Sequence, residues 1–180
     1  MAHETPPQTE VTPLENFRYA KDAFYRMSAD SPLSEAQKLE FSGLDYFPED
    51  TSFIFAVDPQ PFEEQELVAM ATSTDDATHY IRWAKAPMQI GNEHIELTVF
   101  KDPHTGGLFL PFQDGLRGKE TYGAGRYLEP ELQPDGRLKL DFNYAYNPYC
   151  AYNDAWSCPL PPPENSTNVP IRAGEKVFAH

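Results

Sequence analysis

The sequence predicts a mainly β domain: an antiparallel meander that forms a barrel-like or strongly curled sheet, with two N-terminal helices and a proline-rich C-terminal strap. Three observations support this prediction. Strand-like segments follow one another between residues 52 and 146, turn residues separate them, and no spacing suits a helix that crosses between parallel strands. Short connections between consecutive strands favour antiparallel neighbours.

The domain organisation follows from length and composition. The chain has 180 residues, which suits one domain with a proper core and is short for two. We expect a disordered tail over residues 1–12 and a single domain over 13–180. Within it, the helical region spans 13–48, the β meander 52–146, and an ordered crossover and strap 147–180.

The N-terminal region carries two helix signals. Residues 13–29 have apolar side chains at helical spacing, and Thr12 is placed to cap the first turn. Residues 31–41 read SPLSEAQKLEF, in which Ser34 and Gln37 fit a capping box. Two helices, the second one short, are therefore expected before the strands.

The strand region shows alternation with period two. In HIELTVF, for example, Ile95, Leu97 and Val99 alternate with polar side chains. Gly91 followed by Asn92 is one of several turn signals between the segments. The predicted strands are 52–57, 66–73, 78–86, 93–102, 106–114, 123–130 and 136–146.

The C-terminal segment is rich in proline between residues 159 and 170. One interpretation is a stiff, solvated linker. The other is a strap that lies across the sheet, for which Leu160, Val169, Ile171 and Val177 offer apolar anchors. We favour the strap, because proline restricts the chain and lowers the cost of ordering it.

The charge balance indicates which classes of binding partner the surface repels. The formal net charge is −14, so the surface repels phosphate backbones, and neither nucleic acid nor an anionic membrane is an expected partner. Acidity of this size is also compatible with a halophilic source. No apolar run reaches the roughly 18 residues of a membrane span, and the N-terminus lacks signal-peptide features. We therefore expect a cytoplasmic protein.

The first stretch that could carry chemistry is GKETYGAGRYL, residues 118–128. In extended geometry Arg126 lies among apolar neighbours, so its charge needs a partner. One alternative is a structural Arg126–Asp141 ion pair. The other is a pocket in which Arg126 and Lys119 face a carboxylate or phosphate.

The second stretch is DFNYAYNPYCAY, residues 141–152. Tyrosine and asparagine can satisfy the amides of an irregular loop, or they can supply the aromatic walls and hydrogen bonds of a pocket. Both interpretations stay open. For a pocket, the predicted ligand-binding residues are Lys119, Tyr122, Arg126, Asp141, Asn143, Tyr146 and Asn147.

The two cysteines and five histidines show no metal pattern. Cys150 and Cys158 are spaced too far apart for a common zinc motif, and the histidines are scattered. Packed thiols, a disulfide that closes the loop and half of a metal site remain open, in that order of preference. We expect no metal and no cofactor.

Three functions from different classes follow. The preferred one is the binding of a small polar or anionic molecule in a pocket formed by the two stretches. The second is a hydrolase or lyase with Glu120 or Asp141 as general base and a tyrosine, with Tyr122 as candidate, as acid. The third is a structural or partner-binding module in which these residues only stabilise the fold.

The two stretches also carry a family resemblance. Residues 108–128 (LFLPFQDGLRGKETYGAGRYL) and 140–176, which include CPLPPPEN, closely resemble the family catalogued as domain of unknown function 1684. Residues 21–50 are similar to the helical region of that family, so the resemblance covers roughly residues 15 to 177. It implies a soluble bacterial or archaeal domain and assigns neither activity nor cofactor. The matching pieces are Gly118 to Leu128, Asp141 to Tyr152 and Cys158 to Asn165.

Overall fold

The computed structural model describes residues 10–179. The described chain forms two compact units, of which one ends at Phe41 and the other begins at Ser42. Most of the predicted disordered tail, residues 1–9, lies outside the described residues, as does residue 180. The single domain over 13–180 stays a prediction.

The first unit contains the two helices that the sequence predicts. Helix α1 spans Pro13–Met27, and the side chain of Thr12 accepts a hydrogen bond of 3.1 Å from the N–H of Glu15. Helix α2 spans Glu35–Glu40 and begins with a complete capping box between Ser34 and Gln37. Both start signals are therefore confirmed, because each cap satisfies amide groups that the first turn leaves unpaired.

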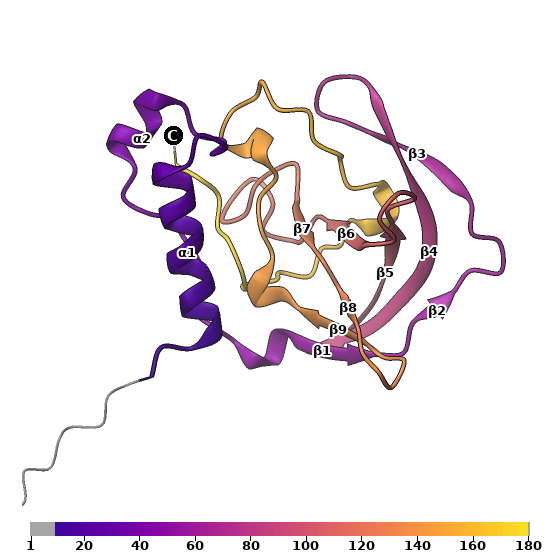
Figure 1. Ribbon diagram of the computed structural model, residues 1–180. Coiled ribbons are helices and arrows are strands. Elements are labelled where there is room, and N and C mark those ends of the chain that lie inside the picture. Colours follow the sequence, from indigo (N-terminus) through magenta and orange to yellow (C-terminus); the bar gives the residue numbers. More distant parts are fainter. Residues whose placement is uncertain (1–9, 180) are drawn as a thin grey trace, which may run out of the picture. The chain divides into compact units, whose positions relative to one another are not determined.

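The second unit contains two antiparallel sheets (Figure 1). A three-stranded sheet has the order β1, β9, β8, with bounds Ile54–Val57, Leu138–Asp141 and Glu131–Leu132. The larger sheet has the order β2, β4, β5, β6, β7, and β3 also pairs with β4. Its strands are β2 Gln60–Pro61, β3 Leu67–Ala71, β4 Ala77–Ile90, β5 Glu93–Lys101, β6 Leu108–Phe112 and β7 Arg126–Leu128.

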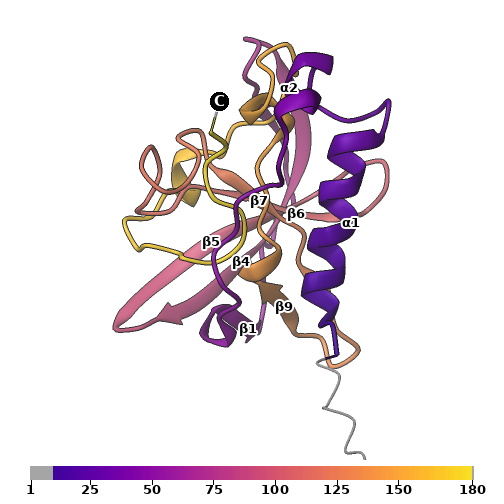
Figure 2. The ribbon, with the colours of Figure 1, turned by 90° about the vertical axis from the view of Figure 1, so that its left-hand side faces the viewer.

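Strands β4 and β5 form a long hairpin that extends beyond its neighbours (Figure 2). A β-bulge interrupts the pairing between Arg82 and Ala84. A bulge inserts one extra residue and so reverses which side chains face the core. Beyond it Ala84 belongs to the hydrophobic core, whereas Tyr80, an even number of residues earlier, does not.

The antiparallel, mainly β prediction is confirmed, but the barrel-like or strongly curled arrangement is not: within residues 10–179 no sheet closes on itself. The reason lies in β9, which pairs with β1 and β8 and so builds a separate sheet instead of extending the meander. The predicted last strand, 136–146, is also too long. It ends at Asp141, whose carboxylate caps the 3₁₀ helix Phe142–Tyr144 that follows.

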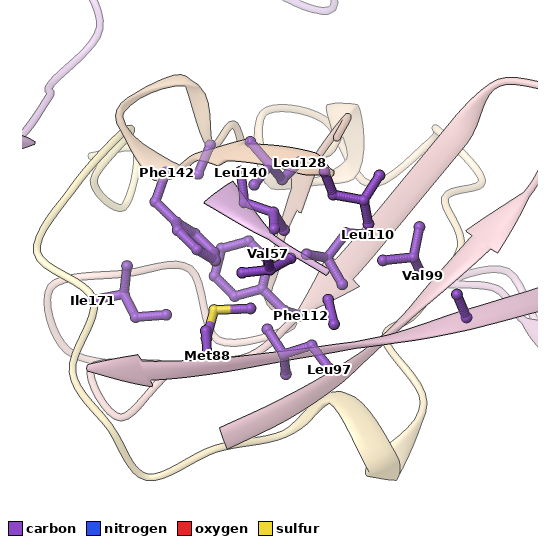
Figure 3. Packing of buried hydrophobic residues seen from close by; sticks show 14 of the residues in the cluster. Val57, Met88, Leu97, Val99, Leu110, Phe112, Leu128, Leu140, Phe142 and Ile171 are labelled. Carbon is purple, nitrogen blue, oxygen red and sulfur yellow. The ribbon is translucent and has the colours of Figure 1, made fainter. Parts of the chain in front are cut away.

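One hydrophobic core joins the two sheets (Figure 3). Val57 and Leu140 reach it from the small sheet, and Leu97 and Leu110 from the large one. Phe142 is fully buried there, and its ring makes edge contacts with two further phenylalanines, Phe55 at 5.9 Å and Phe112 at 5.3 Å between centroids. Such burial supplies most of the favourable free energy of a domain of this size.

The C-terminal strap, residues 159–177, runs beside the large sheet and then beside residues 145–147 (Figure 1). Asn165 attaches it to β5 and β6. Its amide donates to the carbonyls of Thr98 and Pro111, each at 2.8 Å, and accepts from the N–H of Thr98 at 2.7 Å. Because Pro111 has no N–H to offer, this amide occupies the place of a missing strand partner.

Candidate functional site

Arg126 is buried and attaches the C-terminal strap to strand β7. Only 1 % of its surface is exposed, and its guanidinium donates to the carbonyls of Ile171, Ala173 and Glu175. Burial lowers the pKa of Arg126 to about 10, so the group remains charged at neutral pH. These three hydrogen bonds attach the strap to strand β7.

The carboxylate nearest to Arg126 is that of Asp114, at 3.9 Å. Asp114 is itself buried, and it accepts from the hydroxyl of Thr121 at 2.7 Å and from the N–H of Ile171 at 2.9 Å. The predicted Arg126–Asp141 ion pair is therefore wrong. The reason is that Asp141 ends β9 in the other sheet, whereas Asp114 lies two residues after β6, the strand that pairs with Arg126.

Asp141 and Asn143 stabilise a turn. The carboxylate of Asp141 accepts from the N–H of Asn143 at 3.0 Å and from its side-chain amide at 2.9 Å. Asn143 also exchanges two hydrogen bonds with the backbone of Asp50, at 2.9 and 3.0 Å. These contacts connect β9 to the segment before β1 and occupy both side chains.

The remaining polar residues of the first stretch lie at the surface. Lys119 and Glu120 are exposed, and Glu120 forms an ion pair of 3.3 Å with Arg172. Tyr122 is half-buried, with its hydroxyl 3.8 Å from Sγ of Cys150, and burial raises its pKa to about 12. A tyrosine with so high a pKa is a weak proton donor at neutral pH.

Both cysteines are free thiols in the structure. Sγ of Cys158 accepts a hydrogen bond of 3.3 Å from the N–H of Cys150. Burial raises the pKa of Cys158 to about 11, which keeps it protonated and unreactive at neutral pH. The disulfide between Cys150 and Cys158, one of the alternatives that the sequence allows, is therefore not formed in the structure.

The second unit contains an open cleft of about 700 Å³. We call it the aromatic cleft, after the side chains that line it from strands β4, β6 and β7 and from the loop after β9. These side chains are Tyr80, Phe109, Tyr127, Tyr146, Tyr149 and Trp156.

The rings of the aromatic cleft contact one another in series. Phe109 stacks on Tyr80 at 5.1 Å and meets Tyr127 edge-on at 4.8 Å between centroids. Tyr127 in turn meets Tyr146 edge-on at 5.7 Å, and Tyr149 meets Trp156 at 5.1 Å. Contacts of this kind restrict the rings, so the walls of the cleft are preformed.

Two tyrosine hydroxyls in the cleft have fixed partners. Tyr146 donates to a carboxylate oxygen of Glu129 at 2.8 Å, and Tyr127 donates to the carbonyl of Pro159 in the strap. Burial raises the pKa of both tyrosines, and the Glu129 carboxylate raises that of Tyr146 further. Both phenols are therefore neutral hydrogen-bonding groups at physiological pH.

The cleft contains only part of the predicted site. Tyr146 and Asn147 line it, whereas Lys119, Tyr122, Arg126, Asp141 and Asn143 do not. Tyr80 and Phe109 are not among the predicted site residues, although both lie on strands that the sequence predicts. Tyr149 and Trp156 belong to the tyrosine-rich stretch, and that unusual density of aromatic residues was the available signal.

Two structural findings bear on other kinds of site. Within residues 10–179 no three His, Cys, Asp or Glu side chains come together in a way that could hold a metal ion. Among the same residues, neither helix is long and apolar enough to cross a bilayer.

Comparisons with known proteins show which family the chain belongs to. No curated protein matches it. The fold is similar to the solution NMR structure of an uncharacterised protein from Haloarcula marismortui, with a TM-score of 0.69, 34 % sequence identity and 91 % of each chain covered. Residues 39–176 match the family described as "Protein of unknown function (DUF1684)". Since this match covers most of the chain, and includes both predicted stretches, the protein belongs to the DUF1684 family.

Proposed function

We propose that this protein binds a small molecule in the aromatic cleft. The observation that carries the proposal is the cleft itself: about 700 Å³, lined by six aromatic side chains from β4, β6, β7 and the loop after β9. Ligand sites are typically concave, mostly apolar and of roughly 300–1,000 Å³. Partly exposed aromatic side chains gathered in one hollow are also typical of a surface that contacts another molecule.

The enzyme alternative finds no support in this geometry. Glu120 is engaged with Arg172 at the surface, and Asp141 caps its own turn. Neither candidate base lines the cleft, so neither could reach a molecule bound there. The structural alternative applies to Arg126 and Asn143, whose contacts attach the strap and the segment before β1.

Trp156 gives a direct test of the proposal. It is 41 % exposed in the cleft and contacts Tyr149, so we expect Trp156→Ala to leave the fold intact and to weaken the binding of aromatic fragments by roughly ten-fold. The measurement is a saturation-transfer NMR screen of aromatic fragments against the wild type and the variant.

The matched control is Leu132→Ala, which removes an exposed apolar side chain, 56 % accessible, that does not line the cleft. This control should bind fragments like the wild type. Equal binding by the wild type and Trp156→Ala, or binding by neither the wild type nor the control, would contradict the proposal.

A further inference from the structure

The aromatic cleft carries negative charge on its wall. Asp102 at the end of β5, Glu129 after β7 and Glu131 in β8 all line it, and none of its lining residues is Lys, Arg or His. Glu129 and Glu131 are two residues apart, and the fold brings Asp102 to them from another part of the chain. The cleft is therefore acidic as well as aromatic.

None of the three carboxylates forms an ion pair among residues 10–179. Asp102 accepts from the backbone N–H groups of His104 and Thr105, which hold its pKa below the usual range and keep it charged. The imidazole of His104, outside the cleft, also lowers the pKa of Asp102. Glu129 accepts from the hydroxyl of Tyr146, which is neutral. Among the residues that line the cleft, these carboxylates therefore meet no cationic side chain.

The aromatic rings favour the same sign of ligand. The face of an aromatic ring is the negative end of its quadrupole, so a cation over that face is attracted. Here the hydroxyl of Tyr146 donates a hydrogen bond to Glu129, so an aromatic ring and a carboxylate lie side by side in the wall of the cleft. An anionic ligand would meet repulsion from both kinds of group, and the net charge of −14 adds to it.

An organic cation fits this wall better than a metal ion does. Ca²⁺ and Mg²⁺ need several oxygen ligands around one point, and no three acidic or metal-ligating side chains within residues 10–179 are grouped in that way. Spread carboxylates between aromatic rings suit a cation whose charge is shielded by carbon.

We propose that the ligand of the aromatic cleft is a small organic cation, an amine or quaternary ammonium with an attached aromatic or apolar part. This inference rests on the proposed function and differs from the ligand that the sequence predicts, which is a polar or anionic molecule. The cation contacts Glu129 and the ring of Tyr146, and its apolar part contacts Tyr149 and Trp156.

Three probes of one shape and different charge test the inference: phenethylammonium, 2-phenylethanol and phenylacetate, each titrated by NMR at pH 7 and moderate salt. We expect the ammonium to bind about ten-fold more tightly than the alcohol and phenylacetate to bind most weakly, because cation–π and carboxylate contacts each contribute a modest factor.

The double variant Glu129→Gln/Glu131→Gln should reduce the advantage of the ammonium over the alcohol to about two-fold, while the affinity for the alcohol stays unchanged. Glutamine keeps an acceptor for Tyr146, so the wall keeps its shape. Glu63→Gln is the control, since it removes an exposed charge outside the cleft and should leave all three affinities as they are.

The outcomes separate the two proposals. Equal affinity of the wild type for the ammonium and the alcohol would overturn the cation inference and leave the proposed function standing. A preference for the ammonium that survives in the double variant would also overturn it. If none of the probes binds, both the inference and the proposed function fail.

Discussion

Replacing Arg126 by alanine is expected to lower the free energy of unfolding by about 3–5 kcal/mol. The substitution leaves three buried carbonyls of the strap without their donor and the buried carboxylate of Asp114 without its nearest cation. Each unsatisfied buried group costs about 1–3 kcal/mol. Urea unfolding, followed by tryptophan fluorescence, measures the loss as a lower midpoint.

Arg172→Ala is the matched control. Arg172 directly precedes the Ala173–Glu175 segment but is 57 % exposed, and its ion pair with Glu120 is at the surface. Exposed pairs of this kind contribute at most about 1 kcal/mol. If Arg126→Ala unfolded at the same urea concentration as Arg172→Ala, then Arg126 would not hold the strap, and its burial would need another explanation.

Gly174→Ala is expected to cost about 3 kcal/mol or more, from two sources. Gly174 has a φ of +80°, which costs a residue with a side chain about 1–2 kcal/mol. A Cβ at this position would also lie 2.6 Å from the carbonyl oxygen of Ala145 and 2.7 Å from that of Phe142. Both are backbone atoms next to the core, so relieving the clash costs about 1–3 kcal/mol more.

Gly136→Ala separates these two sources. Gly136 has nearly the same φ, +85°, but no atom lies within 4 Å of the added Cβ. This variant should therefore lose only the cost of the left-handed backbone, about 1–2 kcal/mol. The same urea series measures both variants, and equal losses would show that the strap does not pack closely against residues 142–145.

The sequence was sufficient for the elements that depend on local signals. The caps at Thr12 and Ser34 are complete within a few residues, and alternation in β5 is visible from Ile95 to Val99. Of the four apolar anchors expected for the C-terminal strap, Ile171 is fully buried, Leu160 and Val169 are partly buried, and Val177 is exposed. Residues close together in the sequence determine these features, so the sequence alone is sufficient to predict them.

Contacts between residues far apart in the sequence could not be predicted in the same way. Asp114 and Asp141 were equally acceptable partners for Arg126 by chemistry, and only the separation of β9 into another sheet decides between them. The aromatic cleft posed a similar problem. The bulge between Arg82 and Ala84 turns Tyr80 away from the core toward Phe109, and no residue in that segment marks a bulge.

The residues of the two stretches were therefore assigned to a site largely because they are chemically versatile. Arg126, Asp141 and Asn143 use that versatility to satisfy buried backbone groups. The tyrosine-rich stretch was the better indication, since Tyr146 and Tyr149 do line the cleft. In this sequence, polar residues next to the predicted core strands were a weaker indication of the cleft than the high density of aromatic residues.

The most direct test of the central claim, that the aromatic cleft binds the ligand while the buried polar residues hold the fold, is a chemical-shift map of the ¹⁵N-labelled protein with phenethylammonium. The indole N–H of Trp156 and the amides of Tyr146 and Tyr149 should shift, and the indole of the buried Trp83 should not. Shifts confined to residues 118–122 and 141–143, or no saturable shifts at all, would contradict the account.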